Sequence, residues 1–200
     1  MTAPLSSQLE RTARLTACGE VHMSRLNIYW WSLRSRGWDV PHFDPLDGGS
    51  NAKLLVLLER PARQGTAPRF VSRDNPSPTQ RNLRRFLSEA GIERKTTVLW
   101  NLVPWLPPIS SKRNLSPRRA EIEGGLVEIP RFLNCLPHLR GVLLAGRTAA
   151  CAAPVVTECR PELTVFRMPH PSPILLATDP RYATTIADTL ARVAQYLEIS

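Results

Sequence analysis

Four short apolar runs, each bounded by turn-forming residues, constrain the fold of this chain more than any other feature. They are KLLVLL (53–58), TTVLWNLV (96–103), RGVLLAG (140–146) and LTVFRM (163–168). Continuous apolar runs of this length are typical of strands buried on both faces, as in parallel sheets. None approaches the roughly 20 residues that a membrane-spanning helix requires, so the chain is not expected to cross a membrane.

Helical patterns alternate with these runs. The segment TQRNLRRFLSEA (79–90) places its leucines and phenylalanine on one side and its arginines on another, and Gly91 follows as a helix stop. Further helices are predicted at 20–36, at Arg119–Leu133 and at Asp179–Leu197, the last with Asp179 as its cap. This alternation predicts an α/β fold, a three-layer α/β/α sandwich with a central, mainly parallel four-stranded sheet.

With 200 residues, the chain is expected to form a single domain. Its predicted parts are an N-terminal helix and loop (1–50), a core that carries the motifs (53–176) and a C-terminal helix (179–197).

The charge of the chain is concentrated in one stretch. The formal net charge is +9, and residues 60–119 contain thirteen basic residues against three acidic ones. Such a patch favours a polyanionic partner such as nucleic acid, although an arginine-rich but ordinary solvated surface would give the same pattern. The four cysteines lack the spacing of a metal site, and no export signal accompanies them, so we expect reduced thiols.

Polar and backbone-shaping residues follow all four predicted strands. The segments are Glu59-Arg60-Pro61-Ala62, Trp100-Asn101, Ala145-Gly146-Arg147 and Pro169-His170-Pro171-Ser172. In parallel α/β folds the functional site lies beyond the carboxyl ends of the strands, so these segments are expected to form it together.

These segments resemble the motifs of the uracil-DNA glycosylase superfamily over roughly residues 53–176. HPSP (170–173) is similar to the histidine motif of that family, and LERPA (58–62) stands at the place of its first active-site motif. Pro-Arg-Phe (68–70), the strand ending in Asn101 and the Gly146 loop are similar to further motifs in the same order.

The resemblance implies a role for each motif. Phe70 would stack on a flipped base, and Asn101 would pair with uracil N3–H and O4. His170 would donate toward O2, where negative charge develops, and backbone amides around Arg60, Pro61 and Ala62 would assist. Without the resemblance, Phe70 is better explained as a core residue, while Asn101 is explained equally well as a residue that satisfies the end of a strand.

The chain departs from the family pattern in its first motif. Arg60 replaces the aspartate with which one branch of the family handles water, and a guanidinium is no base. The remaining candidates are Asp74, Asn75 and Glu59, of which Asp74 is favoured because it follows Phe70; an Asx-turn is its alternative role. At Ala62 another branch uses a bulky aromatic residue against thymine. The cysteine spacing predicts no iron–sulfur cluster, and we expect no metal and no cofactor.

Contacts with DNA are expected on both sides of the pocket. The candidates for phosphate contacts, whose alternative roles are turns and caps, are Asn75, Ser77, Thr79, Gly146, Arg147 and Ser172. Ile174 or Leu175 is expected to enter the minor groove as a wedge, the alternative being a buried turn.

Together these features predict a monomeric uracil-DNA glycosylase that acts on double- or single-stranded DNA. A catalytically silent binder of uracil or abasic DNA, and a glycosylase for another base, are the alternatives. We expect a cytoplasmic, nucleoid-associated protein without a membrane partner.

Overall fold

The computed structural model describes residues 5–62, 67–107 and 116–199. The four apolar runs form the four strands of one sheet, which are β2 (Leu54–Leu58), β4 (Thr97–Asn101), β5 (Gly141–Ala145) and β6 (Thr164–Met168). Every residue of β2, β4 and β5 is buried, as the continuous apolar runs predict. β6, the edge strand next to β5, differs in that only Met168 among its residues is buried.

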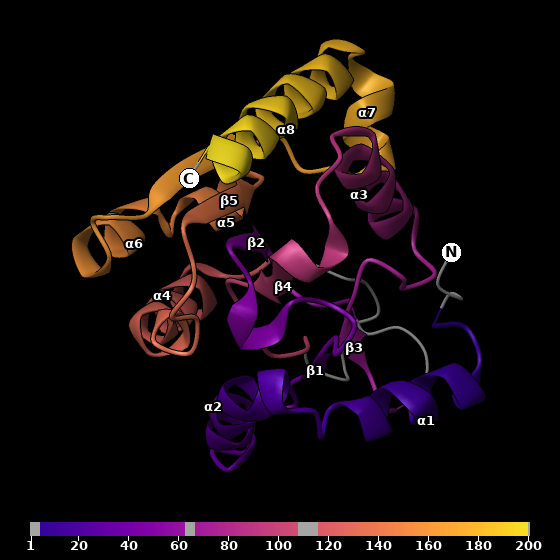
Figure 1. The fold of residues 1–200 in the computed structure, drawn as a ribbon, viewed down its shortest axis with the longest axis vertical. Coiled ribbons are helices and arrows are strands. Elements are labelled where there is room, and N and C mark those ends of the chain that lie inside the picture. Colours follow the sequence, from indigo (N-terminus) through magenta and orange to yellow (C-terminus); the bar gives the residue numbers. More distant parts are fainter. Residues whose placement is uncertain (1–4, 63–66, 108–115, 200) are drawn as a thin grey trace.

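The sheet is parallel throughout and has the order β4-β2-β5-β6. Figure 1 shows it between α3 (Pro78–Glu89) and α8 (Arg181–Ile199) on one side and α2 (Ser24–Arg34) and α4 (Arg119–Leu133) on the other. The predicted α/β/α sandwich with a parallel four-stranded sheet is therefore confirmed.

The connections of the sheet reverse direction at its centre. From β2 the chain passes through α3 to β4 on one side, and from β4 it passes through α4 to β5 on the other side of β2. In open parallel sheets such a reversal leaves a crevice at the carboxyl ends of the two central strands, which is where ligands bind. Here the two strands are β2 and β5.

The predicted helices 79–90, 119–133 and 179–197 are present as α3, α4 and α8. Two adjacent glycines lie inside α4, and Gly125 has a packing reason: a Cβ atom at this position would lie 2.2 Å from the carbonyl oxygen of Leu102. Asp179 precedes α8, where its carboxylate accepts a hydrogen bond from the Arg181 amide at 2.9 Å. Between β5 and α8 lie three short helices, α5 (Arg147–Ala150), α6 (Ala153–Cys159) and α7 (Pro173–Thr178).

The N-terminal region contains more structure than the single helix that its sequence predicts. A separate helix, α1 (Gln8–Ala17), precedes α2, and Ser7 caps it by accepting a hydrogen bond from the Glu10 amide. The predicted loop after α2 contains β1 (His42–Phe43), which pairs in parallel with β3 (Phe70–Val71) in a second, two-stranded sheet. Three single-turn 3-10 helices complete the fold, η1 (Val21–Met23), η2 (Gly49–Asn51) and η3 (Arg94–Thr96).

The second sheet places a half-buried histidine, His42, where it affects stability. The His42 ring stacks on Trp30 with ring centroids 4.1 Å apart, and burial, together with the charge of Arg34, lowers the pKa of His42 to about 4. Between about pH 4 and 6.5 the unfolded chain therefore binds a proton that the folded chain does not. The contribution of His42 is fully present above this window and is lost as the pH falls through it.

We expect His42→Gln to remove this contribution to the pH dependence of the unfolding free energy. A pKa shift of this size corresponds to a change of about 3 kcal/mol across the window. Urea unfolding of both proteins at several pH values measures it. Parallel stability profiles of wild type and variant between pH 4 and 7 would contradict the prediction.

Candidate active site

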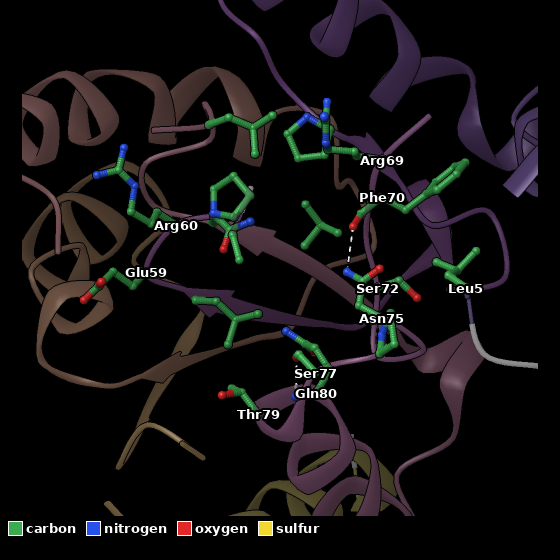
Figure 2. Close-up of a pocket in the computed structure, with 18 of the residues that line it drawn as sticks. Leu5, Glu59, Arg60, Arg69, Phe70, Ser72, Asn75, Ser77, Thr79 and Gln80 are labelled. Atoms are coloured by element: carbon green, nitrogen blue, oxygen red, sulfur yellow. Dashed lines mark hydrogen bonds between the residues drawn. The ribbon is translucent and has the colours of Figure 1, made fainter. Parts of the chain in front are cut away.

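A pocket of about 340 Å³ opens at the carboxyl edge of the four-stranded sheet. Ten of the sequence-predicted site residues line it: Glu59, Arg60, Pro61, Ala62, Phe70, Asn75, Ser77, Thr79, Asn101 and His170. They come from the ends of β2, β4 and β6, from the segment around β3 and from the start of α3. Figure 2 labels those of β2, β3 and α3. The topology of the sheet thus brings together side chains that lie more than a hundred residues apart in the chain.

Asn101 is the last residue of β4, in register with Leu58 of β2, and is only 3% exposed. Because the amide of such a residue is held by the sheet, its position in the pocket wall is fixed by the strand. A buried amide with both donor and acceptor groups suits the recognition of a ligand with the opposite hydrogen-bonding pattern.

His170 follows β6 and lies between two prolines that restrict its backbone. A Cβ atom at Gly146 would lie 3.0 Å from the Cβ atom of His170, and Gly146 has a φ of 93°, so both space and backbone conformation require glycine there. Burial lowers the pKa of His170, and the negative charge of Glu59 opposes this shift. At neutral pH the imidazole is therefore mainly neutral.

Glu59 follows β2 and is half-buried in the pocket wall. Its Oε2 atom accepts a hydrogen bond from the Thr148 hydroxyl at 2.6 Å, and Thr148 belongs to α5, directly after β5. The two residues thus join the two strands between which the crevice lies. The negative charge of this carboxylate also acts on the His170 imidazole, whose pKa it raises against the effect of burial.

Arg60 lines the pocket, but its guanidinium is held elsewhere. It forms an ion pair with Glu121 of α4 at 3.0 Å, and the Arg60 side chain is only 7% exposed. Figure 2 shows Glu59 and Arg60 on the side of the pocket opposite Phe70 and Leu5. The backbone of the Arg60 segment therefore contributes to the pocket wall, while its charge is neutralised by α4.

Phe70 lies at the far side of the pocket and is 4% exposed. Its ring belongs to a small apolar cluster with Leu5 and Cys18, and its carbonyl oxygen accepts a hydrogen bond from the Asn75 side-chain amide at 2.8 Å (Figure 2). The N-terminal segment thus packs against the residue expected to stack on a base.

Asp74 does not line the pocket, contrary to the expectation that it borders it. Its side chain is fully buried, and it forms ion pairs with Arg14 and Arg94, each at 2.6 Å. Burial favours a raised pKa for Asp74, but the hydrogen bonds from Arg94 and Arg14 outweigh it and hold the pKa below its ordinary value. Asp74 belongs to a buried ion-pair network and does not reach the pocket, so it is no longer a candidate for water activation.

This network also changes the interpretation of the basic stretch at 60–119. Arg73 and Arg94 lie inside the protein, where they face Asp44, Asp47 and Asp74. Of the cations of this stretch that the structure describes, Arg60 and Arg69 line the pocket. Arg63, Lys112 and Arg113 lie outside the described residues. Part of the basic stretch is therefore internal structure and not a surface for a polyanion.

The N-terminus of α3 forms a further wall of the pocket, at the bottom of Figure 2. Ser77 is its cap and accepts a hydrogen bond from the Gln80 amide at 3.2 Å, and Thr79 lies in the first turn. The Asn82 amide of the same helix donates to the Pro171 carbonyl at 3.0 Å. This bond ties α3 to the segment that carries His170.

The remaining predicted contact residues lie around the pocket without lining it; these are Gly146, Arg147, Ser172, Ile174 and Leu175. Ser172 caps α7 by accepting a hydrogen bond from the Leu175 amide at 3.3 Å. The apolar segment after HPSP therefore forms a helix and not the predicted loop or turn. Ile174 is 80% exposed on this helix, whereas Leu175 is half-buried.

Sequence reasoning missed several residues of the site, among them Leu5, Arg11 and Thr148. Leu5 and Arg11 line the pocket although they precede every motif, and nothing in their local sequence indicates this position. Thr148 directly follows the Ala145-Gly146-Arg147 segment after β5, but only the folded chain shows that its hydroxyl contacts Glu59.

Among the described residues, no three His, Cys, Asp or Glu side chains gather so as to hold a metal ion. The described parts of the chain also contain no helix with the length and apolar character of a membrane span. The four cysteines are free thiols, of which Cys18 is buried.

Comparison with known proteins identifies relatives of this fold. A family model described as the uracil DNA glycosylase superfamily matches residues 46–192. Among solved structures, wild-type SMUG2 from Pedobacter heparinus is similar, with a TM-score of 0.56 and 13% sequence identity over 75% of this chain and 77% of that chain. The search of curated proteins gave no match.

Proposed function

Because the chain belongs to the uracil-DNA glycosylase superfamily, we propose that it hydrolyses the N-glycosidic bond of uracil in DNA and leaves an abasic site. The observation that carries this proposal is the convergence of Asn101, His170 and Glu59, from three strand ends, on one pocket. The glycosidic bond inside a duplex is out of reach of side chains, so the nucleotide has to be flipped into the pocket. The proposal includes action as a monomer.

Asn101 selects the base. Its amide oxygen accepts from uracil N3–H and its amide group donates to O4, whereas cytosine presents the inverse pattern. Cytosine would leave buried polar groups unpaired, at a cost of about 1–3 kcal/mol each. The burial of Asn101 makes this penalty effective, since little water remains to replace the lost bonds.

His170 stabilises the departing base. As the glycosidic bond breaks, negative charge grows on uracil O2, and a neutral imidazole can donate a hydrogen bond to it. Burial supports this role because it keeps the imidazole neutral. The contact with Gly146 supports it as well, since it restricts the position of the side chain.

Glu59 binds and activates the water nucleophile, because Arg60 stands where one branch of the family has an aspartate for this task. Among the acidic candidates raised by the sequence, it is the one in the pocket wall, while Asp74 is buried in ion pairs. A carboxylate there can accept the water proton and stabilise the positive charge that develops on the sugar. Arg60 supplies backbone to the wall, with Pro61 and Ala62.

Phe70 stacks on the flipped base in this proposal, and its ring is held in place by packing against Leu5. Asn75, Ser77, Thr79, Gly146, Arg147 and Ser172 surround the pocket as candidate phosphate contacts. Ile174 serves as the wedge rather than Leu175, since it presents an exposed apolar side chain next to the HPSP segment.

The proposal is tested by incubating the protein with a uracil-containing oligonucleotide and then cleaving abasic sites with alkali. We expect strand scission at the uracil position and none in an oligonucleotide with cytosine there. Matched oligonucleotides with a thymine mismatch or hypoxanthine test the other glycosylase activities, to which the small side chain of Ala62 is relevant. Scission no greater than in buffer for every base would leave a catalytically silent binder.

DNA affinity is expected to fall with salt, because phosphate contacts release counterions. The logarithm of the binding constant should fall linearly with that of the salt concentration, with a slope of about −0.9 per phosphate neutralised. Fluorescence anisotropy with duplex DNA containing a stable abasic-site analogue measures the slope. A flat response would contradict a phosphate-contacting surface around the pocket.

A further inference from the structure

Thr148 makes a hydrogen bond that its local structure does not require. It is the second residue of the short helix α5, so no preceding turn of that helix offers a carbonyl oxygen to its hydroxyl. Instead, its hydroxyl donates to Glu59, which lies 89 residues earlier in the sequence, at 2.6 Å. Hydrogen bonds to an ionised acceptor are shorter and about twice as strong as neutral ones.

The bond occupies one carboxylate oxygen of Glu59 and leaves the other available as a hydrogen-bond acceptor. Within the described parts of the chain, the Thr148 hydroxyl is the only hydrogen-bond donor to this carboxylate, and it contacts Oε2. Oε1 is therefore the oxygen left to accept a hydrogen bond from water. A long side chain anchored at one oxygen presents the other oxygen in a restricted range of positions, which matters because catalysis requires near-attack geometry.

The segment that carries Thr148 also contacts the second catalytic candidate. Gly146, two residues before Thr148, packs against the Cβ atom of His170. The turn after β5 thus contacts both the carboxylate of Glu59 and the side chain of His170. The two groups act on opposite ends of the breaking bond, the sugar and the base.

On this basis we propose that Thr148 is a positioning residue for Glu59, an inference that rests on the proposed glycosylase function. In the step concerned, the water oxygen bonds to C1′ of the sugar and one water proton passes to Glu59 Oε1. The bond between C1′ and N1 breaks, and its electron pair leaves with the base, toward which His170 donates. The Thr148 hydroxyl keeps its proton and only holds Oε2.

The test replaces Thr148 by valine, which has nearly the same shape but no donor. We expect the single-turnover rate of uracil excision to fall about tenfold, because a hydrogen bond to a charged group is lost. Affinity for DNA with an abasic-site analogue should stay unchanged, and Thr148→Ser should restore the rate to within about twofold of wild type. Thr157→Val, an exposed threonine of α6, is the matched control.

A double-mutant cycle separates positioning from a general structural role. In a Glu59→Gln background, Thr148→Val should cause almost no further loss, since the positioned group is already gone. An equal tenfold loss in both backgrounds, or a valine variant as fast as wild type, would overturn the inference while leaving the glycosylase function intact. A wild-type protein that excises no uracil would overturn the proposed function and the inference with it.

Discussion

Replacing either Asn101 or His170 by alanine is expected to remove about 2–4 kcal/mol of transition-state stabilisation from uracil excision, comparable to the loss of one oxyanion-hole donor. For Asn101 the loss reflects unpaired groups on uracil N3–H and O4. For His170 it reflects uncompensated negative charge on O2 as the base departs. Single-turnover excision from a uracil-containing oligonucleotide measures both effects as rate constants.

Exposed residues of the same types provide the controls. Asn134, at the end of α4, and His138, in the following loop, are exposed and lie outside the pocket wall. Their alanine variants should excise uracil at the wild-type rate. If Asn101→Ala and His170→Ala did the same, neither residue would belong to the reacting centre, and the proposed roles would have to be abandoned.

Replacing Asp74 by alanine is expected to lower the free energy of unfolding by about 3–5 kcal/mol, because it removes one of the carboxylates that compensate the buried Arg14 and the half-buried Arg94. Arg14 is 4% exposed and contacts Asp44 at 2.5 Å as well as Asp74, while Arg94 contacts the same two carboxylates. The network joins α1 to the segments after β1 and β3. Its loss should therefore loosen the N-terminal wall of the pocket along with the core.

Chemical unfolding and thermal melting measure this effect. For a chain of this size, a change of 1 kcal/mol shifts the melting temperature by about 2–4 °C, so the melting temperature of Asp74→Ala should be lower by about 6–20 °C. Asp188→Ala, an exposed aspartate of α8, is the matched control and should melt like wild type. An unchanged melting temperature for Asp74→Ala would contradict a structural role and return this carboxylate to the candidates for water activation.

Glu59→Gln should behave in the opposite way to Asp74→Ala. Its carboxylate is half-buried at the pocket, with one hydrogen bond among the described residues, so the substitution should affect the excision rate far more than the melting temperature. The pair of variants thus distinguishes a carboxylate that acts on water from one that holds the fold together.

The parallel sheet could be predicted because its central strands are buried on both faces and so require continuous apolar sequence. That requirement is local, and it appears directly in runs such as Leu54–Leu58 and Gly141–Ala145. Since all strands of a parallel sheet end at one edge, the residues after each run could also be assigned to one site. The pocket unites Glu59, Asn101 and His170 as this argument expects.

The N-terminal helix and the short helix after HPSP were harder to predict. The apolar side chains of α1 are sparse, because the helix is held largely by Arg14 and its carboxylates and by the small cluster around Leu5, Cys18 and Phe70. Its leucines, Leu9 and Leu15, are exposed, and the buried residue of the helix is Arg14, so the apolar residues of this segment do not mark the face that packs on the protein. The α7 segment likewise depends on the cap supplied by Ser172.

The sequence by itself therefore determined the sheet, the order of its motifs and the edge at which the site lies. Only the tertiary structure decided which acidic residue belongs to that site. Asp74 follows Phe70 in the chain, yet it is buried in an ion pair with Arg14, which lies 60 residues earlier. The Glu59 carboxylate is held at the pocket by a hydrogen bond from Thr148, which lies 89 residues later. Ion pairs and hydrogen bonds between distant segments form only when the strands are assembled, so they cannot be predicted from the local sequence.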